Sequence, residues 1–414
     1  MGLFRFLHLA DVHLETHFGG RRSTRDRLRR ATLEAFRTAV DFAIDQELHA
    51  ILVAGDLYDD RLLSLRTELE LVRQVRRLTD AGVWFLYACG NHDPGDPRYR
   101  AAHLGLDAIG AGERVRVFRE AEPEQVTIHN RGGRPVAVVV GAGHAGEREG
   151  ANLAARFPRV ENELPVVGLL HTHVASAREA AAHDRYAPST PADFARLDYS
   201  YWALGHIHVR QRAVEGLPVH YAGNLQGRNP RETGEKGGLR VEARAGAPAE
   251  PKFQRFAPVR WERIRVAELP STRAIAELAE HVSRCVDEHM TRGEQLIACV
   301  DLVGETPLTP ALRLAEEREA LGRELAARTG ALEVQVFDAG LCRPVDRAAL
   351  RAAPTVLADA LTLAERARTD DALLHRIAPE ALAGAPSDEL AYLRSLLADL
   401  PEELVERSLR RDEA

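Results

Sequence analysis

Short apolar runs alternate with longer amphipathic stretches in the N-terminal part of the chain. The apolar runs occupy residues 3–10, 50–54 and 83–89. Between them, apolar side chains recur at helical spacing over residues 24–47 and about 63–81. Short runs bounded by glycine and acidic residues are typical of buried parallel strands, and the amphipathic stretches then form the crossover helices. The pattern predicts a β-α-β-α-β unit at the start of an α/β domain.

Side chains that can bind a cation follow each of these three runs. Asp11 and His13 follow the first run, Asp56 follows the second, and Asn91 and His92 follow the third. The carboxyl ends of parallel strands lie at one edge of a sheet, so we expect these groups to meet there. A carboxylate at a buried edge is costly unless it is hydrogen-bonded or holds a cation. Taken alone, Asp56 also fits a strand that ends in a solvated acidic turn.

Later apolar runs are rich in β-branched residues and predict a second sheet. The run 164–170 precedes His171, and the run 201–205 precedes His206 and His208. We expect this sheet to pack face to face on the first, with helices outside, as an α/β two-sheet sandwich. The other runs assigned to the second sheet are 114–118, 125–129, 135–143, 217–223, 237–243 and 251–256.

The pattern changes twice in the C-terminal part of the chain. Residues 1–258 form the first predicted domain, and strand and helix signals then alternate over 259–345 as a small β-α-β-α-β domain. The last segment, 346–414, is predicted to be helical. An apolar stripe at helical spacing near its end packs either on the chain's own small domain or in the groove of a partner. The stripe consists of Leu390, Leu393, Leu397, Leu400 and Leu404.

Charge and cysteine content argue against several classes of protein. The formal net charge of −7 over 414 residues argues against a surface built for indiscriminate nucleic-acid binding. A local basic patch that includes Arg21 and Arg22 fits phosphate contacts and a solvated helix face equally well. The 4 cysteines form no CxxC pair, so neither a zinc knuckle nor a disulfide framework is indicated.

The sequence carries no signal for a membrane. No apolar run approaches the roughly 20 residues of a membrane span. The N-terminal stretch lacks the charged, apolar and small-residue regions of a signal peptide. We therefore expect a cytoplasmic protein.

The residues that follow the predicted strands are all of types that can bind a divalent cation, and they recur in a fixed order along the chain. Aspartate, histidine and asparagine without a thiolate suit Mn²⁺, Fe²⁺ or Zn²⁺ better than Ca²⁺ or a structural zinc. Chance alone rarely produces the whole set in this order, so the sequence predicts a metal site where the strands end.

This ordered set resembles the motifs of the calcineurin-like metallophosphoesterases, which hold two metal ions at the strand ends of a β-sandwich. The resemblance implies two divalent ions, with Mn²⁺ favoured and Fe²⁺ or Zn²⁺ as alternatives. It also implies that His92 is a catalytic residue and not a ligand. The implied ligands are Asp11, His13, Asp56 and His208 for one ion, and Asp56, Asn91, His171 and His206 for the other.

Physical chemistry is consistent with this division of roles. Two cations about 3.5 to 4 Å apart need a shared carboxylate to offset their repulsion, and together they lower the pKa of a water between them toward 7. A histidine beside a ligand is well placed to donate a proton to the leaving group. We expect Asp93 to orient His92, and Asp59 is a candidate for a supporting role. His173 remains an alternative to His171 as a ligand.

Three stretches resemble the DNA-repair exonuclease branch of the family, the SbcD and YhaO type. They are FLHLADVHL at 6–14, GDLYD at 55–59 and YAGNLQGRNPRETGEKGG at 221–238. The resemblance implies a two-metal-dependent DNA nuclease, acting as exonuclease or endonuclease in DNA repair or processing. It also implies that residues 259–345 form a capping domain. The segment 346–414 would then dock on an SMC-like ABC ATPase, and the chain would form a homodimer.

Two points stay open. The glycine-rich loop with Arg228, Arg231 and Lys236 is expected to approach a phosphate backbone, with a solvated hairpin as the alternative. A metallophosphatase or cyclic-nucleotide phosphodiesterase for small molecules shares the metal centre but has less use for a cap and docking helices. A metal-free scaffold that only binds DNA or an ATPase is disfavoured, because no ligand position is missing.

Overall fold

The chain is described from a computed structural model. It covers residues 2–18, 22–59, 64–99, 105, 106, 109, 113–161, 163–291, 293–344, 346–377, 394, 397, 400 and 404. One compact unit comprises Met1–Glu262 and Met290–Ile297, and the other comprises Arg263–His289 and Ala298–Ala414. Within the covered ranges, no helix combines the length and the apolar character needed to cross a bilayer.

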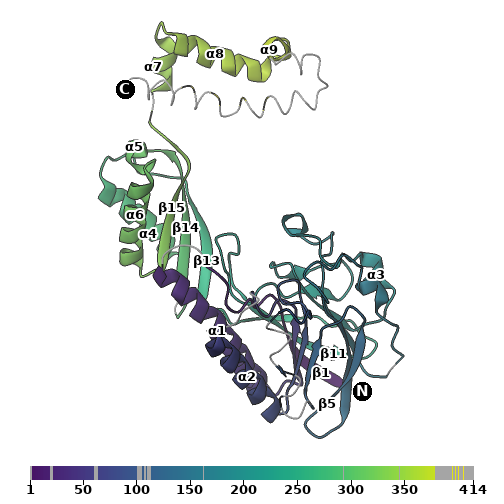
Figure 1. The fold of residues 1–414 in the computed structure, drawn as a ribbon. Coiled ribbons are helices and arrows are strands. Elements are labelled where there is room, and N and C mark those ends of the chain that lie inside the picture. The colour runs from purple at the N-terminus through teal and green to yellow at the C-terminus, as the bar shows by residue number, and fades with distance from the viewer. Residues whose placement is uncertain are drawn as a thin grey trace. The chain divides into compact units, whose positions relative to one another are not determined.

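The first sheet carries the N-terminal motifs (Figure 1). Its four parallel strands lie in sequence order, and a helix forms each of the first two crossovers. The helices are α1 (Arg22–Asp45) and α2 (Leu65–Asp80). The strands are β1 (Leu3–Leu9), β2 (Ala50–Ala54), β3 (Trp84–Ala88) and β4 (Val115–Phe118).

Three runs that we assigned to the second sheet belong to the first, so that assignment was wrong. They are β4, β11 (Gly237–Arg244) and β12 (Lys252–Arg255), and the sheet order is β12-β11-β1-β2-β3-β4. β11 pairs antiparallel with β1, with Phe6 opposite Val241. The physical reason is that β2 covers only one edge of β1. The other edge leaves a row of unpaired backbone groups that a distant strand satisfies.

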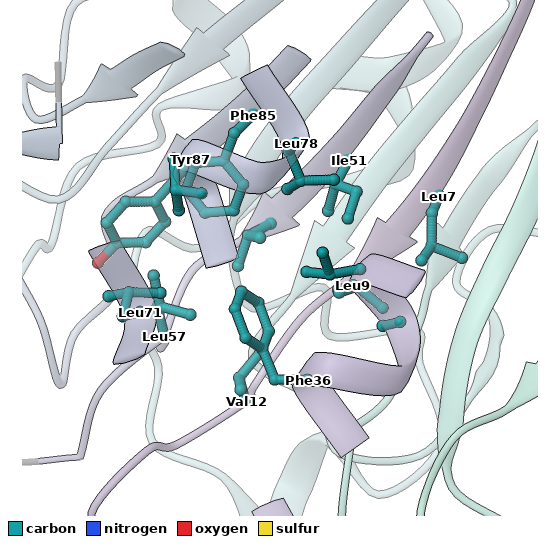
Figure 2. Packing of buried hydrophobic residues seen from close by; sticks show 14 of the residues in the cluster. Leu7, Leu9, Val12, Phe36, Ile51, Leu57, Leu71, Leu78, Phe85 and Tyr87 are labelled. Carbon is teal, nitrogen blue, oxygen red and sulfur yellow. The ribbon is translucent and has the colours of Figure 1, made fainter. Parts of the chain in front are cut away.

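The two long helices bury one face of this sheet in a continuous apolar cluster. Helical spacing on α1 and α2 and alternate positions on the strands bring these side chains onto facing surfaces (Figure 2). Burial of each large side chain here stabilises the fold by about 1.5–3 kcal/mol. This packing fixes where the strands end. Members of the cluster include Leu7, Leu9, Phe36, Val40, Ile51, Leu71, Leu78, Phe85 and Tyr87.

The second sheet packs on the opposite face of the first. Its order is β5-β6-β7-β8-β10-β9. Phe6 from the first sheet and Val139, Leu169 and Tyr201 from the second share one buried cluster. This arrangement confirms the predicted α/β two-sheet sandwich flanked by helices. The strands are β5 (Glu124–His129), β6 (Pro135–Ala142), β7 (Val166–His171), β8 (Tyr201–Gly205), β9 (Gln211–Arg212) and β10 (Val219–Tyr221).

Short helical elements cover the outer face of the second sheet. They are α3 (Pro191–Ala195) and the 3₁₀ turns Ala154–Arg156 and Ala180–Ala182. Trp202 on β8 anchors them, because its ring packs against Phe157 and Phe194. Aromatic contacts of this kind add to the area that the rings bury.

The C-terminal part contains the predicted β-α-β-α-β arrangement and then helices. A three-stranded sheet in the order β13-β14-β15 is joined by α4, α5 and α6, and α7, α8 and α9 follow. The domain limits at 258 and 345 stay predictions. In the leucine stripe, Leu390 and Leu393 lie outside the described residues. The bounds are β13 (Val259–Val266), α4 (Ile275–Asp287), β14 (Gln295–Glu305), α5 (Thr309–Leu312), α6 (Ala315–Thr329), β15 (Glu333–Cys342), α7 (Arg347–Ala352), α8 (Val356–Thr369) and α9 (Asp371–Ile377).

Candidate metal centre

The strands of both sheets end in register, and this brings the predicted ligands together. In the first sheet, Ala54 at the end of β2 lies opposite Ala88 at the end of β3. In the second, His171 at the end of β7 lies opposite Gly205 at the end of β8. The residues that follow each strand therefore converge on one edge of the sandwich, as the sequence predicts.

Three triads of described side chains have ligand atoms within 4.8 Å of one another. They are Asp11, His13 and His208; Asp11, Asp56 and His171; and His13, Asp56 and His92, so the predicted catalytic histidine also lies at the cluster. Oδ2 of Asp56 lies 3.7 Å from Nε2 of His13 and 3.5 Å from Nε2 of His171. Asp56 thus contacts a predicted ligand of each ion, which is the position that a bridging carboxylate needs. Carboxylates and imidazoles without thiolates suit Mn²⁺, Fe²⁺ or Zn²⁺.

Asn91 and His206 lie beside these triads. The side-chain Oδ1 of Asn91 is 2.9 Å from Nε2 of His171. The backbone N–H of His206 donates to the Asp11 carboxylate at 3.1 Å, and its ring lies edge-on to the ring of His171 with centroids 5.2 Å apart. Among the described residues, His206 is in none of the groups whose atoms fall within 4.8 Å.

Each of the four predicted histidine ligands has a ring nitrogen bonded to a carbonyl or carboxylate oxygen of the protein. In His13, His206 and His208, the nitrogen that donates to this acceptor carries the proton, so the other nitrogen keeps its lone pair for a metal. In His171, the other nitrogen, Nε2, faces the predicted ligand atom Oδ1 of Asn91. The ring orientations therefore fit a metal site. The bonds are His13 Nδ1 to Asp59 Oδ1 at 3.1 Å, His171 Nδ1 to the Ala54 carbonyl at 2.9 Å, His206 Nε2 to the Asp184 carbonyl at 2.8 Å and His208 Nδ1 to Glu232 Oε1 at 2.9 Å.

Burial keeps two of these imidazoles neutral. Desolvation, aided by the charge of Arg228, lowers the pKa of His13 to about 4. Desolvation, aided by His171, lowers the pKa of His206 to about 2. Neutral imidazole is the form that binds a metal, so both rings are ready to bind one near neutral pH.

The backbone around the centre is strained. Asp11, His13, Asp56 and His206 have φ values of 48°, 51°, 51° and 110°, a region that non-glycine residues rarely adopt. Gly90 allows a close approach, because a Cβ there would lie 2.2 Å from Oδ1 of Asp56. Strain of this kind persists only where the surrounding structure enforces it, and it clusters at functional sites.

Asp59 holds His92 beside the ligands. Nδ1 of His92 lies 2.8 Å from Oδ1 of Asp59, and the His92 side chain is 44% exposed. Burial acts to lower the pKa of His92, but the hydrogen bond with Asp59 and the charges of Asp56 and Asp59 outweigh it and raise the pKa to about 9. An exposed, protonated imidazole at this position can donate a proton to a bound substrate.

Asp93 does not orient His92, so that prediction was wrong. Its buried carboxylate accepts the backbone N–H groups of Gly90, Leu57 and Tyr58. Asp93 therefore fixes the loop that carries Asp56. Asp59 orients His92 instead, because the bridge between Tyr58 and Leu14 holds Asp59 beside the segment that carries His13.

Glu232 supports His208, and the sequence analysis did not single it out. Its Oε2 accepts a bond from Asn224 Nδ2 at 2.7 Å and from the backbone N–H of Arg228 at 2.7 Å, while Oε1 contacts His208. These bonds hold the carboxylate in one orientation. Its position within the RETGEKG stretch is the only sequence signal for it.

Comparison with models of protein families identifies the family to which this chain belongs. The family model described as Calcineurin-like phosphoesterase matches residues 4–210, a range that includes every predicted ligand. This chain belongs to that family. Calcineurin-like phosphoesterases use divalent metals, and the aspartate and histidine cluster described above can hold one.

Individual relatives confirm the resemblance to the SbcD and YhaO type. "Uncharacterized metallophosphoesterase YhaO" of Bacillus subtilis is 33% identical over 284 residues, which are 66% of this chain and 66% of the relative. "DNA double-strand break repair protein Mre11" of Aeropyrum pernix is 27% identical over 340 residues, which are 77% of this chain and 78% of the relative. A solved dimetal phosphatase from Danio rerio is 14% identical, with a TM-score of 0.34 over 61% of this chain and 99% of that chain.

The other histidines near this calcineurin-like centre have structural partners. Nε2 of His173 bonds to the Ala180 carbonyl at 3.0 Å, and the residue belongs to none of the three triads found among the described residues, so His171 stays the predicted ligand. His144 and His183 were missed in the sequence analysis. Nε2 of His144 bonds to the His171 carbonyl at 2.8 Å, and the His183 ring lies 5.2 Å from that of His208.

The centre opens into a cavity of about 840 Å³. Arg228 lines it and lies 3.5 Å from Oδ2 of Asp59, so this predicted nucleic-acid contact is at the site. Arg22 is not among the described lining residues; it begins α1, with its side chain 89% exposed. Arg21 lies outside the described residues.

Proposed function

We propose that this chain is a two-metal-dependent DNA nuclease that hydrolyses phosphodiester bonds in DNA repair or processing. The observation that carries the proposal is the Asp11, Asp56 and histidine cluster beside an open cavity that cations also line. Arg228 and Lys236 are two of these cations. A DNA strand brings one negative charge with each nucleotide, so it matches both the metals and the cations. The Mre11 relatives, whose name includes DNA double-strand break repair, support this substrate class.

The proposed ligands fall into two sets, one for each ion, and the two sets share Asp56. Asp11, His13, Asp56 and His208 hold one ion, and Asp56, Asn91, His171 and His206 hold the other. Two divalent ions in such a site polarise a phosphodiester and supply a nucleophile from water near neutral pH. We favour Mn²⁺, with Fe²⁺ or Zn²⁺ as alternatives.

His92 acts on the leaving group in this proposal. Asp59 holds Nδ1 of His92, so Nε2 is free to deliver a proton to the departing oxygen. Transfer of a proton by a positioned side chain contributes about 10²- to 10⁴-fold to the rate. Arg228 lies between Asp59 and Glu232 and lines the cavity, where its guanidinium can contact a phosphate.

The proposal includes partners that rest on the family resemblance. An SMC-like ABC ATPase would dock on the helical segment 346–414, of which α7 to α9 are described. Nucleotide binding to that partner would control access of DNA to the centre. A homodimer acting on DNA in the cytoplasm completes the proposal.

A substrate panel tests the proposed function. The full chain, loaded with Mn²⁺, is given a labelled DNA duplex, bis-p-nitrophenyl phosphate and p-nitrophenyl phosphate, with Asp56→Ala as the control. We expect Mn²⁺-dependent cleavage of DNA and of the diester, and loss of both in Asp56→Ala. Faster hydrolysis of the monoester than of DNA would identify a phosphatase instead. Absence of cleavage with DNA binding intact would identify a scaffold.

A further inference from the structure

A second cavity adjoins the one at the metal centre. Its volume is about 270 Å³, near the lower end of ligand cavities in proteins. His208 and Lys236 line both cavities, whereas Gly223 and Phe253 line only the second. A ligand that extends from the metal centre past His208 therefore enters the second cavity.

Lys236 is a buried cation at the junction of the two cavities. Its side chain is 9% exposed, and its Nζ donates to the backbone carbonyl of His208 at 3.3 Å. No carboxylate oxygen in the described part of the chain lies within 4.0 Å of its Nζ, although Glu232, Glu179 and Asp11 lie near enough to attract it. Glu232 is itself engaged by His208 and Asn224. An ammonium has three N–H donors, so two are left for a ligand. A buried unpaired charge is costly, and an anion that pairs with it offsets this cost.

The choice of lysine at this position is unusual for the chain. The sequence has 55 lysine and arginine residues, and only Lys236 and Lys252 are lysines. Arginine therefore occupies nearly every other basic position. A lysine ammonium is compact and binds a phosphate as a point charge, whereas a guanidinium is a planar fork.

The far end of the second cavity offers a stacking surface and open backbone. The guanidinium of Arg210 lies 3.5 Å from the ring centroid of Phe253, and Arg210 remains exposed. Gly234 has φ +79°, and a Cβ placed there would meet nothing within 4 Å. Glu179 and Glu235 also line the cavity and reduce its positive charge. Arginine planes and open backbone are features of sites that hold unpaired nucleotides.

We propose that the second cavity binds the nucleotide next to the scissile phosphodiester of a single DNA strand, with Lys236 on its phosphate and Arg210 on its base. The inference rests on the proposed function, because the second cavity adjoins the centre at which that function places the scissile phosphodiester. The subsite makes the chain selective for substrates with more than one phosphate.

Binding of a short strand at several salt concentrations tests the subsite without hydrolysis. The full chain, freed of metal by chelation, is titrated with 5′-phosphorylated tri-thymidylate. We expect Lys236→Met to weaken binding about 10-fold and to reduce the slope of log K against log salt by about 0.7, the value for one phosphate contact on a single strand. Lys252→Met is the matched control, since Lys252 is exposed on β12, and it should change neither quantity.

A second variant covers the case in which Lys236→Met fails to fold. Arg210→Ala removes an exposed side chain from the other end of the cavity, and we expect it to weaken binding of tri-thymidylate about 5- to 160-fold, which corresponds to the roughly 1–3 kcal/mol that stacking on one base contributes. A folded Lys236→Met protein with wild-type affinity and salt slope overturns the subsite. Wild-type affinity in Arg210→Ala overturns it as well.

The outcomes separate this inference from the proposed function. Lys236-dependent binding in a chain that does not cleave DNA supports the subsite and contradicts the nuclease proposal. Cleavage of DNA by a chain whose binding is indifferent to Lys236→Met supports the nuclease proposal and overturns the subsite.

Discussion

Nδ1 of His92 lies 2.8 Å from Oδ1 of Asp59, and the same oxygen lies 3.1 Å from Nδ1 of His13. One carboxylate therefore orients both a predicted metal ligand and the predicted proton donor. A change at Asp59 should disturb metal binding and turnover together, whereas a change at His92 should disturb turnover alone.

The first prediction uses this contrast. His92→Asn should keep its metal content and lose about 10²- to 10⁴-fold in kcat, because a proton donor is removed without a ligand. Asp59→Asn should lose about 10- to 100-fold in metal affinity or activity, because the ring of His13 is no longer held. Elemental analysis and turnover of bis-p-nitrophenyl phosphate check both variants. Loss of metal in His92→Asn would make His92 a ligand.

Glu232 should control the affinity of the ion bound by His208. Glu232→Gln replaces the carboxylate that accepts from Nδ1 of His208, so metal affinity should fall about 10- to 100-fold. Titration of the metal-free chain with Mn²⁺ measures the change. Glu242→Gln, on the exposed part of β11, is the matched control and should bind Mn²⁺ as the wild type does. Equal Mn²⁺ affinities in Glu232→Gln and Glu242→Gln would show that Glu232 does not support the ion bound by His208.

An ion pair joins Glu70 on α2 to Arg37 on α1, and its contribution to stability depends on pH. It accepts from Arg37 Nε at 2.6 Å and from Gln74 Nε2 at 2.7 Å. The Arg37 hydrogen bond is the main cause that lowers the pKa of Glu70 below its ordinary 4.5, against an opposing effect of burial. A lowered pKa in the folded state stabilises the protein above the unfolded pKa, and this contribution is lost as the pH falls through the folded pKa.

Glu70→Gln should therefore lower the free energy of unfolding by about 1 kcal/mol at pH 7. The difference from wild type should shrink as the pH falls below 4.5. Urea unfolding at a series of pH values measures it, with the exposed Glu122→Gln as the control. A difference that stays constant with pH would show that packing, and not charge, accounts for the effect.

Removal of the C-terminal helices should separate the proposed docking of an ATPase from catalysis. A cut after Pro344 spares β15, whose Cys342 carbonyl accepts from Thr309 Oγ1 at 2.8 Å. The shortened chain should stay folded and should hydrolyse bis-p-nitrophenyl phosphate with Mn²⁺, because every predicted ligand precedes residue 209. It should no longer co-purify with the ATPase. An insoluble product would show that the helices belong to the core, and retained co-purification would place docking elsewhere.

The sequence was most informative where chemistry follows directly on a strand. Asp11, Asp56 and Asn91 each stand just after a parallel strand, so the topology alone brings them to one edge of the first sheet. The helical spacing of apolar side chains over 24–47 and about 63–81 also predicted the crossover helices that the structure shows as α1 and α2. Local pattern suffices here, because parallel βα units place neighbours in sequence beside one another.

Contacts between distant segments were not predictable in the same way. β11 pairs with β1 across most of the first domain, and alternation along a strand does not name its partner. Asp93 is next to His92 in sequence, yet Asp59 is next to it in space. Glu232 lies in a loop whose shape no periodicity describes.

The most direct test of the central claim is the number of Mn²⁺ ions that each chain binds. Purified full-length protein, stripped by chelation and reloaded with Mn²⁺, is analysed by mass spectrometry for metal per chain. The account predicts two ions in the wild type and loss of both in Asp56→Ala, because that carboxylate is proposed to serve both ions. A single ion in the wild type, or two ions retained in Asp56→Ala, would contradict the account.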